Sequence, residues 1–314
     1  MDWSTLIDMI IPGALLAVWA DKRKHNKDLE AKIETLATKE EVDHKIKHES
    51  DARKEMAALD REYLSDRFDG IREDIKEIKV ETPYGIPSQP VMKGRIKGID
   101  IVVILRHGKG HKINPTNVNN RANIYAMKKL GVARILAPCA VGSLKEEIKP
   151  GDLVILDQFI DKTTSRISTF YDKNQVCHIS MAEPFCPELR KLVIEAGKKL
   201  KLPIHEKGTN VVMEGPRFST KAESELHRRW NADTINMTLA PECTLAKEAQ
   251  ICYVPIAQVT DYDCWKESTV TAEVIVNTLK DNVEKTKKLL LNVIPKISEK
   301  KSCNCEDALK HALL

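Results

Sequence analysis

The sequence predicts an α/β fold: a mixed β-sheet flanked by helices, preceded by an N-terminal helical or coiled-coil segment. Two observations indicate the sheet. Short apolar runs typical of strands recur after residue 85, and amphipathic helical patterns separate several of them. A third observation indicates the helical segment, because residues 21–79 carry 15 Lys or Arg and 17 Asp or Glu with no Pro. Residues 80–314 are enough for a complete hydrophobic core.

The apolar N-terminal segment, residues 1–20, allows two interpretations. Residues 3–20 are mostly apolar and are followed at once by basic residues. As a short membrane anchor, this segment would leave the rest of the chain in the cytoplasm. It is equally typical of an interfacial helix or of one packed against a partner. The sequence therefore predicts a cytoplasmic protein with a possible membrane anchor.

Residues 21–79 predict a charged helix with a narrow apolar stripe. Leu29, Ile33 and Leu36 fall at spacings of three and four, and the pattern returns at Met56 and Leu59. Such a stripe is typical of a coiled coil, and a lone solvated helix is the alternative.

The remaining chain, residues 80–314, alternates predicted strands and helices. The predicted strands are 101–105, 133–137, 153–156, 209–213 and 251–259. The predicted helices are 121–130, 188–200, 221–230 and 246–250, and a long amphipathic helix over 271–294 closes the domain.

Charge and cysteine usage exclude some functions. A formal net charge of +4 is too small to indicate nucleic-acid binding. The eight cysteines form no CxxC pair, so we expect no metal site. Cys303-Asn304-Cys305 is compatible with two exposed thiols on a tail or with a disulfide element.

Two carboxylates follow the predicted strand 251–259. Asp261 and Asp263 stand just past its carboxyl end, where open α/β sheets bind ligands. One of them could hold a proton for a leaving group. A solvated turn or a helix cap is the alternative.

Two further segments predict an anion site. Arg106 and His107 follow the predicted strand 101–105 and offer a guanidinium fork beside a switchable donor. Residues 137–143 are small, and we expect them to form a turn whose backbone N–H groups face an oxyanion. A surface ion pair explains Arg106 equally well.

The segment after strand 209–213 predicts a helix start and a base contact. Thr220 and Glu223 have the spacing of a capping box. Phe218 could stack on an aromatic base. Met237 and Thr238 precede another helix and could reach a sugar and a phosphate, although Met237 is as consistent with the core.

Together these motifs resemble the methylthioadenosine phosphorylases of the trimeric purine nucleoside phosphorylase family. The resemblance runs from about residue 78 to the C-terminus. It rests on Thr82-Pro83-Tyr84-Gly85, Arg106-His107-Gly108, Asn123-Ile124-Tyr125-Ala126, Val141-Gly142-Ser143, Glu214-Gly215-Pro216-Arg217-Phe218-Ser219, Asn236-Met237-Thr238 and Thr260-Asp261-Tyr262-Asp263-Cys264-Trp265.

The resemblance implies phosphorolysis of 5′-methylthioadenosine, with phosphate as co-substrate and no cofactor. It also implies a homotrimer or a dimer of trimers. Asp261 would protonate adenine N7, and Asp263 would bind the 6-amino group. The phosphate would be held by Arg106, His107, Cys139, Ala140 and Thr238. The nucleoside would be contacted by Met237, Phe218, Ser219 and His178.

The chain departs from the family at two places. Family members carry a Gly-rich phosphate loop after a first strand, where this chain has the charged segment 21–79. They also place Thr, Ser or Asn where this chain has Cys139. The alternatives to a working phosphorylase are therefore an impaired or non-catalytic adenine-nucleoside-binding protein and a phosphorylase or hydrolase with altered phosphate use.

Overall fold

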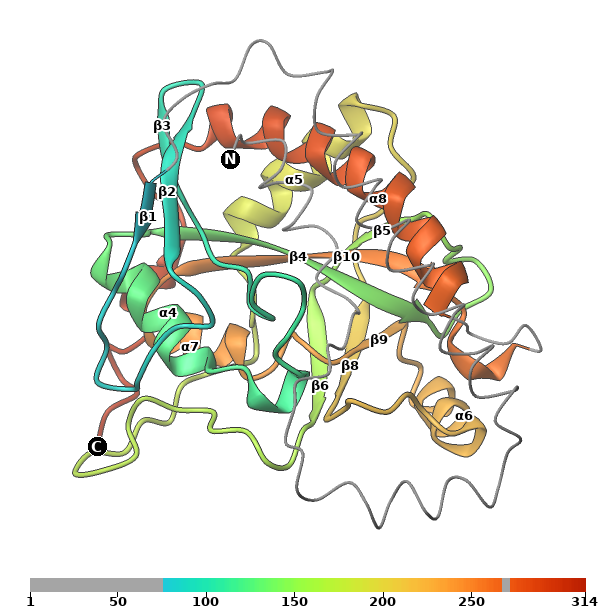
Figure 1. Cartoon of the computed structure of the whole chain (residues 1–314), viewed down its shortest axis with the longest axis horizontal. Helices are drawn as coiled ribbons and strands as arrows, with labels where there is room; N and C mark the ends of the chain where they lie inside the picture. Colours follow the sequence, from blue (N-terminus) through green and yellow to red (C-terminus); the bar gives the residue numbers. More distant parts are fainter. Residues whose placement is uncertain (1–75, 267–271) are drawn as a thin grey trace, which may run out of the picture. The chain divides into compact units, whose positions relative to one another are not determined.

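The computed structural model describes residues 76–266 and 272–314, and all of them belong to one compact unit (Figure 1). The predicted apolar segment and nearly all of the predicted charged helix lie outside the described residues. None of the helices described here is long and apolar enough to cross a membrane.

A seven-stranded mixed sheet forms the centre of this unit. Its strand order is β6-β8-β9-β4-β10-β5-β7. Two ten-residue strands, β4 (Arg134–Ser143) and β10 (Cys252–Asp261), run parallel in the middle (Figure 1). The other strands are β5 (Leu153–Ile155), β6 (Gln158–Lys162), β7 (Ile204–His205), β8 (Thr209–Met213) and β9 (Thr234–Asn236).

Helices cover both faces of the sheet, and the alternation of side chains along β10 shows why. Val254 and Ile256 pack with α5 (Pro187–Lys199) and α8 (Ala272–Val293) in one apolar cluster. Tyr253 and Val259 face the opposite way and pack with α4 (Asn120–Lys129) and α7 (Glu242–Glu248). A strand that is buried on both faces is largely apolar, and β10 is apolar throughout from Cys252 to Ala257.

A smaller antiparallel sheet joins β1 (Lys76–Ile78), β2 (Val91–Ile96) and β3 (Ile99–Val103). The predicted strand 101–105 therefore exists as β3, but it lies outside the central sheet. Residues 76–78 correct the prediction that the charged helix continues to residue 79, because they pair with β2. Ile78 lies opposite the buried Val91, so backbone pairing and burial override the helical pattern.

Most remaining predicted elements are confirmed within one or two residues. One prediction is wrong: residues 137–143 form no turn but continue β4 to Ser143. Their backbone pairs in register with β10 from Ala137–Pro255 to Val141–Val259. Helix α7 also begins four residues earlier than predicted, at Glu242. The helix predicted at 221–230 is α6 (Lys221–Arg229), and Thr220 caps it with Glu223 in the predicted capping box.

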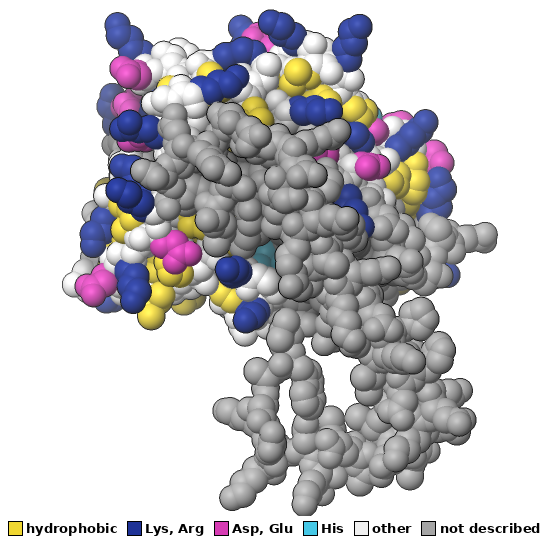
Figure 2. All heavy atoms as spheres, turned by 45° about the horizontal axis from the view of Figure 1, so that its top comes forward, with side chains coloured by type: hydrophobic (Ala, Val, Ile, Leu, Met, Phe, Trp, Pro, Cys, Tyr) yellow, Lys and Arg dark blue, Asp and Glu magenta, His cyan; other side chains and the backbone are white. Residues whose placement is uncertain are grey.

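The surface drawn in Figure 2 shows Lys and Arg side chains spread around its edges with Asp and Glu between them. They do not gather into one patch on this face. Such a distribution is typical of a solvated surface, and the expected lack of nucleic-acid binding stays a prediction.

Candidate active site

The two predicted carboxylates lie together at the carboxyl end of β10. Asp261 is the last residue of that strand, and Asp263 begins a short 3₁₀ helix (Asp263–Trp265). The Asp261 Oδ1 atom accepts the backbone N–H of Asp263 at 2.8 Å, and its Oδ2 accepts the Thr260 hydroxyl at 2.7 Å. Asp263 is buried, and its Oδ2 has no partner among the described residues.

Burial raises the pKa of the Asp261 carboxyl, and the nearby charge of Asp263 adds to this. The hydrogen bonds from Thr260 and from the Asp263 backbone oppose the shift without cancelling it. A carboxyl that keeps its proton to higher pH is suited to donate that proton.

Gly142 in β4 leaves room for the side chains of Asp261 and Asp263, because it has no side chain of its own. In the β4–β10 register, Gly142 lies opposite Asp261. A Cβ atom at Gly142 would lie 3.0 Å from the Asp261 Oδ1 and 3.3 Å from the Asp263 Cβ. Any side chain here would therefore push against both acids.

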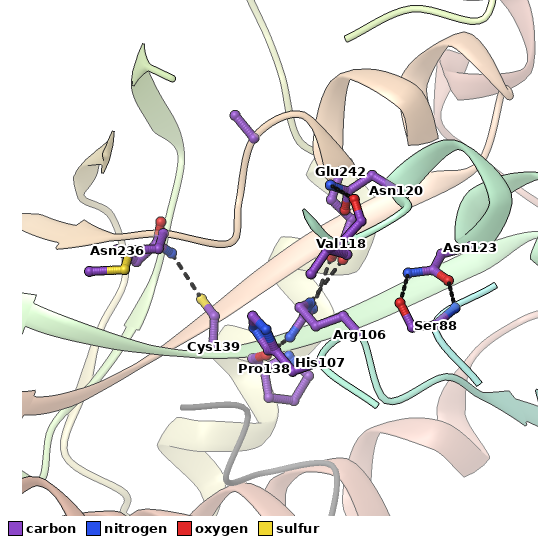
Figure 3. Close-up of polar contacts among 12 residues, drawn as sticks. Ser88, Arg106, His107, Val118, Asn120, Asn123, Pro138, Cys139, Asn236 and Glu242 are labelled. Carbon is purple, nitrogen blue, oxygen red and sulfur yellow. Dashed lines mark hydrogen bonds and ion pairs between the residues drawn. The ribbon is translucent and has the colours of Figure 1, made fainter. Parts of the chain in front are cut away.

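Arg106 is held by a buried carboxylate that the sequence did not single out. Its Nε and Nη2 atoms donate to Glu242 Oε2 and Oε1 at 2.8 and 2.9 Å, and its Nη1 donates to the Pro138 carbonyl at 3.0 Å (Figure 3). Tyr253 donates its hydroxyl to the same Glu242 at 2.8 Å. Burial opposes the charge on Arg106, but the Glu242 carboxylate outweighs it and raises the pKa of the guanidinium.

His107 is buried in its neutral form beside Arg106. Burial and the stacked His111 ring lower the pKa of His107 to about 3. Its Nδ1 lies 2.9 Å from the Ile113 carbonyl, so a neutral ring donates from Nδ1. The Nε2 atom is left as a buried acceptor without a partner among the described residues.

Cys139 lies inside β4 next to these groups, and its thiol faces the core. Asn236 Nδ2 donates to its Sγ at 3.5 Å (Figure 3). The Sγ also lies 3.9 Å from the Ile256 carbonyl. Burial raises the pKa of the Cys139 thiol to about 11, so it is not a thiolate nucleophile at neutral pH. The adjacent Ala140 is less buried and lies two residues before Gly142, about 7 Å along the strand.

Met237 and Thr238 directly follow β9, whose last residue, Asn236, contacts Cys139. Gly215, at φ +70°, lets the Met237 side chain cross close above the backbone, since a Cβ there would lie 2.5 Å from its Sδ. The Thr238 hydroxyl is buried without a partner among the described residues. Arg166 fixes this region by donating to the carbonyls of Met237 and Glu214, at 2.7 and 2.5 Å.

Ser219 connects the loop after β8 to the carboxylate pair. Its carbonyl oxygen lies 3.2 Å from the Cys264 Sγ, directly after Asp263. Phe218 beside it is 45 % exposed. An exposed ring at this position is free to contact a ligand.

In the part of the chain that the structure describes, His178 forms no hydrogen bond with the other predicted site residues. It is exposed, and its backbone N–H donates to the Ala312 carbonyl at 2.7 Å. The C-terminal tail therefore holds the strand-like segment around it, where Cys177 pairs with Leu313.

Within residues 76–266 and 272–314, three of the predicted site residues thus present buried polar atoms that find no hydrogen-bond partner: His107, Thr238 and Asp263. Buried polar groups are nearly always hydrogen-bonded, so such atoms mark places where a polar ligand fits. The sequence analysis did not predict that Glu242 and Arg166 belong to the site. Each is a single charged residue whose partners come from distant segments. The only local indication of either residue was the helix start at Pro241-Glu242.

A separate cavity of about 290 Å³ lies away from these residues. Its lining includes Tyr84, Arg121, Phe170 and Asp172, and none of the predicted site residues. Arg121 and Asp172 form an ion pair in its wall at 2.5 Å.

Comparison with known proteins assigns the class. Residues 63–295 match the family model of the Phosphorylase superfamily, so the chain belongs to that superfamily. Within it, the chain is similar to the S-methyl-5'-thioadenosine phosphorylase of Pyrococcus furiosus, with 56 % identity over 241 residues, 77 % of this chain and 93 % of the relative. The enzyme of the same name from Nitrosopumilus maritimus is 53 % identical over 77 % of this chain and 92 % of the relative.

Solved structures agree with this placement. A methylthioadenosine phosphorylase from an antarctic soil metagenomic library matches with a TM-score of 0.74 and 42 % identity, over 77 % of this chain and 86 % of that chain. Methylthioadenosine phosphorylase from Schistosoma mansoni in complex with adenine matches with a TM-score of 0.72 and 39 % identity, over 75 % and 89 %. The predicted phosphorylase-type fold is confirmed.

Proposed function

We propose that this chain catalyses the phosphorolysis of 5′-methylthioadenosine to adenine and 5-methylthioribose-1-phosphate. The observation that carries this is the pair Asp261 and Asp263 at the end of β10, with Gly142 making room beside them. The names of curated relatives above 50 % identity support the same activity. The chain is thus a pentosyltransferase that takes nucleoside and phosphate.

The base side of the site supplies the proton. As the glycosidic bond stretches, the ribose becomes oxocarbenium-like and the purine gains negative charge. Asp261, with its raised pKa, donates to adenine N7 and relieves that charge. The free Oδ2 of Asp263 accepts from the 6-amino group, which favours 6-amino over 6-oxo purines.

The phosphate side holds the nucleophile. Arg106 keeps two N–H donors beyond its three observed bonds, and the Thr238 hydroxyl offers another. The Nε2 lone pair of His107 accepts a hydrogen bond from the one proton that hydrogen phosphate carries. At Cys139 and Ala140 we expect backbone contacts, because the thiol is engaged in the core. Phosphate is the only co-reactant we expect, with no cofactor.

The remaining predicted contacts complete the nucleoside site. Met237 lies along the ribose and Phe218 on the base, with Ser219 beside it. His178 lines the 5′ side, where the methylthio group sits. We also propose a homotrimer or a dimer of trimers, which light scattering of the full-length chain tests directly.

Base selectivity tests the proposal. In phosphate buffer, the protein should cleave 5′-methylthioadenosine far faster than 5′-methylthioinosine. Asp263→Ala should reduce this preference, and Asp261→Ala should lower kcat/KM for both nucleosides by roughly 10²–10³-fold. The exposed Asp100→Ala, on β3, is the matched control. Equal rates for the two nucleosides in the wild type would contradict the assigned roles.

A further inference from the structure

A buried guanidinium joins three segments of the chain beside the site. Arg166 lies in the loop after β6, and its side chain is 3 % exposed. Its Nη1 donates to the carbonyls of Met237 and Ala240, both at 2.7 Å. Its Nη2 donates to the carbonyls of Glu214 and Met213, at 2.5 and 3.4 Å, and its Nε donates to the Glu214 Oε1 at 3.1 Å. One side chain therefore connects the loop after β6 to the end of β8 and to the chain that follows β9.

These contacts engage every donor of the Arg166 side chain. A guanidinium carries five N–H groups, and Arg166 makes five hydrogen bonds. Arg106, by contrast, makes three such bonds and keeps two N–H groups for phosphate. Arg166 has no donor left for a ligand, so it acts on the site only through the groups that it holds.

The carbonyls that Arg166 holds belong to the ends of two neighbouring strands. β8 and β9 run parallel and pair with each other, so both chains leave the sheet at the same edge (Figure 1). Directly after β9 come Met237 and Thr238, the predicted contacts to ribose and phosphate. Directly after β8 comes Glu214, which leads into the loop that carries the predicted base contact, Phe218. The base side and the phosphate side of the site are therefore both attached to one guanidinium.

The carboxylate of Glu214 neutralises Arg166 and orders the loop that carries it. Its Oε2 accepts the backbone N–H groups of Thr164 and Ser165, at 2.5 and 3.0 Å. Burial alone would raise the pKa of Glu214, but these two bonds and the contact with Arg166 outweigh burial and lower the pKa to about 2. The carboxylate is thus ionised at neutral pH, and the buried guanidinium has its counter-charge.

We propose that Arg166 is a positioning residue that fixes the base side of the site relative to the phosphate side. The proposal rests on the proposed function, which assigns residues after β8 to the base and residues after β9 to ribose and phosphate. Phosphorolysis breaks the bond between base and ribose while phosphate forms a bond to the ribose, so both sides must be in place at once. A misplacement of about 1 Å on either side costs roughly 10²-fold in rate. Lysine cannot replace Arg166, because an ammonium group offers three donors from a single point and does not reach both strand ends.

Arg190 provides a matched comparison away from the site. It lies on α5 and donates to the carbonyls of Leu156, Ile155 and Glu206, at 2.8, 3.3 and 2.7 Å. Like Arg166, it connects separate segments through their backbone carbonyls. None of its acceptors is next to a predicted site residue in the sequence, so its loss should affect the fold and not the ligands.

The test compares Arg166→Lys with Arg190→Lys in the full-length protein. Titration calorimetry measures the binding of adenine and of inorganic phosphate, and neither measurement depends on turnover. We expect Arg166→Lys to weaken the binding of each ligand about tenfold and to lower kcat for 5′-methylthioadenosine roughly 10²-fold. Arg190→Lys should lower the melting temperature and leave both affinities and kcat unchanged. A lower melting temperature as the only effect of Arg166→Lys would overturn the proposal, and so would a loss confined to one ligand.

Glu214→Gln tests the same contacts if the lysine variant does not fold. This change weakens one contact of Arg166 and leaves its four carbonyl contacts, so both affinities should fall together, each by about threefold. Unchanged affinities in this variant would contradict the positioning role. A wild type that binds both ligands but releases no adenine would overturn the proposed function alone, since the same titrations still measure the effect of Arg166. A wild type that binds neither ligand would overturn both.

Discussion

The guanidinium of Arg106 and the carboxylate of Glu242 form a two-point ion pair inside the domain, at 2.8 and 2.9 Å. The pair joins the loop after β3 to the first residue of α7. Because Glu242 fixes both the Nε and the Nη2 atoms, it determines where the remaining Arg106 donors point. Glu242 is thus a positioning residue for the phosphate site.

Glu242→Gln should weaken phosphate binding more than nucleoside binding. The amide keeps the shape, but it removes the charge and turns an N–H group toward Arg106. We expect KM for phosphate to rise roughly 10²-fold, with a smaller change in KM for methylthioadenosine. The free energy of unfolding should fall by about 3 kcal/mol. Tyr253→Phe, which removes one hydrogen bond to Glu242, is the milder comparison at about 1 kcal/mol. Equal increases in both KM values would contradict the positioning role.

Thr238→Val should weaken phosphate binding without lowering the stability of the fold. The Thr238 hydroxyl is buried and unpartnered among the described residues, so its removal takes nothing from the folded protein. We expect the unfolding free energy to stay constant or to rise by about 1 kcal/mol. KM for phosphate should rise about tenfold, because one donor to the anion is lost. A lower melting temperature with an unchanged KM would show that the hydroxyl serves the fold instead.

Gly142→Ala should damage the base side of the site. The new Cβ would stand 3.0 Å from the Asp261 Oδ1 and 3.3 Å from the Asp263 Cβ, so one or both acids must shift. A displacement of this size should lower kcat/KM by roughly 10²-fold. Steady-state kinetics measure this, with the melting temperature as the control for folding. An unchanged kcat/KM would mean that the acids tolerate displacement and do not act at the reacting base.

Buried neutral histidines should make the protein less stable in mild acid. Burial lowers the pKa of His107 to about 3 and that of His111 to about 4, against an ordinary value of 6.5. Below pH 6.5 the unfolded chain binds protons that the folded chain does not, so the unfolding free energy decreases as pH falls toward 4.

Urea unfolding at several pH values measures this effect. Between pH 6.5 and 5 the contribution of His107 should be about 1–2 kcal/mol, and His107→Gln should flatten the decline. Hydrogen bonds from backbone N–H groups and from Arg side chains lower the pKa values of Glu214 and Glu223 to about 2. These two carboxylates therefore lose their contribution to stability in a more acidic range, below about pH 4.5. Stability that rises from pH 6.5 to 5 would contradict the neutral state of His107.

Sequence reasoning succeeded where the signal is local or periodic. The buried strand β10 and the acid at its end followed from an apolar run and its neighbours, and the Thr220–Glu223 capping box followed from a fixed spacing. Residues 137–143 were mistaken for a turn, because their small side chains hide a strand that is specified by pairing with β10. The pair Arg106–Glu242 could not be predicted, since 136 residues separate its members.

Adenine release from 5′-methylthioadenosine, measured with and without phosphate on the full-length protein, tests the central claim most directly. The proposed function predicts rapid release that requires phosphate and yields one sugar phosphate per adenine. Release of adenine without phosphate and without sugar phosphate would indicate hydrolysis. No release under either condition, with the nucleoside still bound, would contradict the proposed catalysis and leave a binding protein.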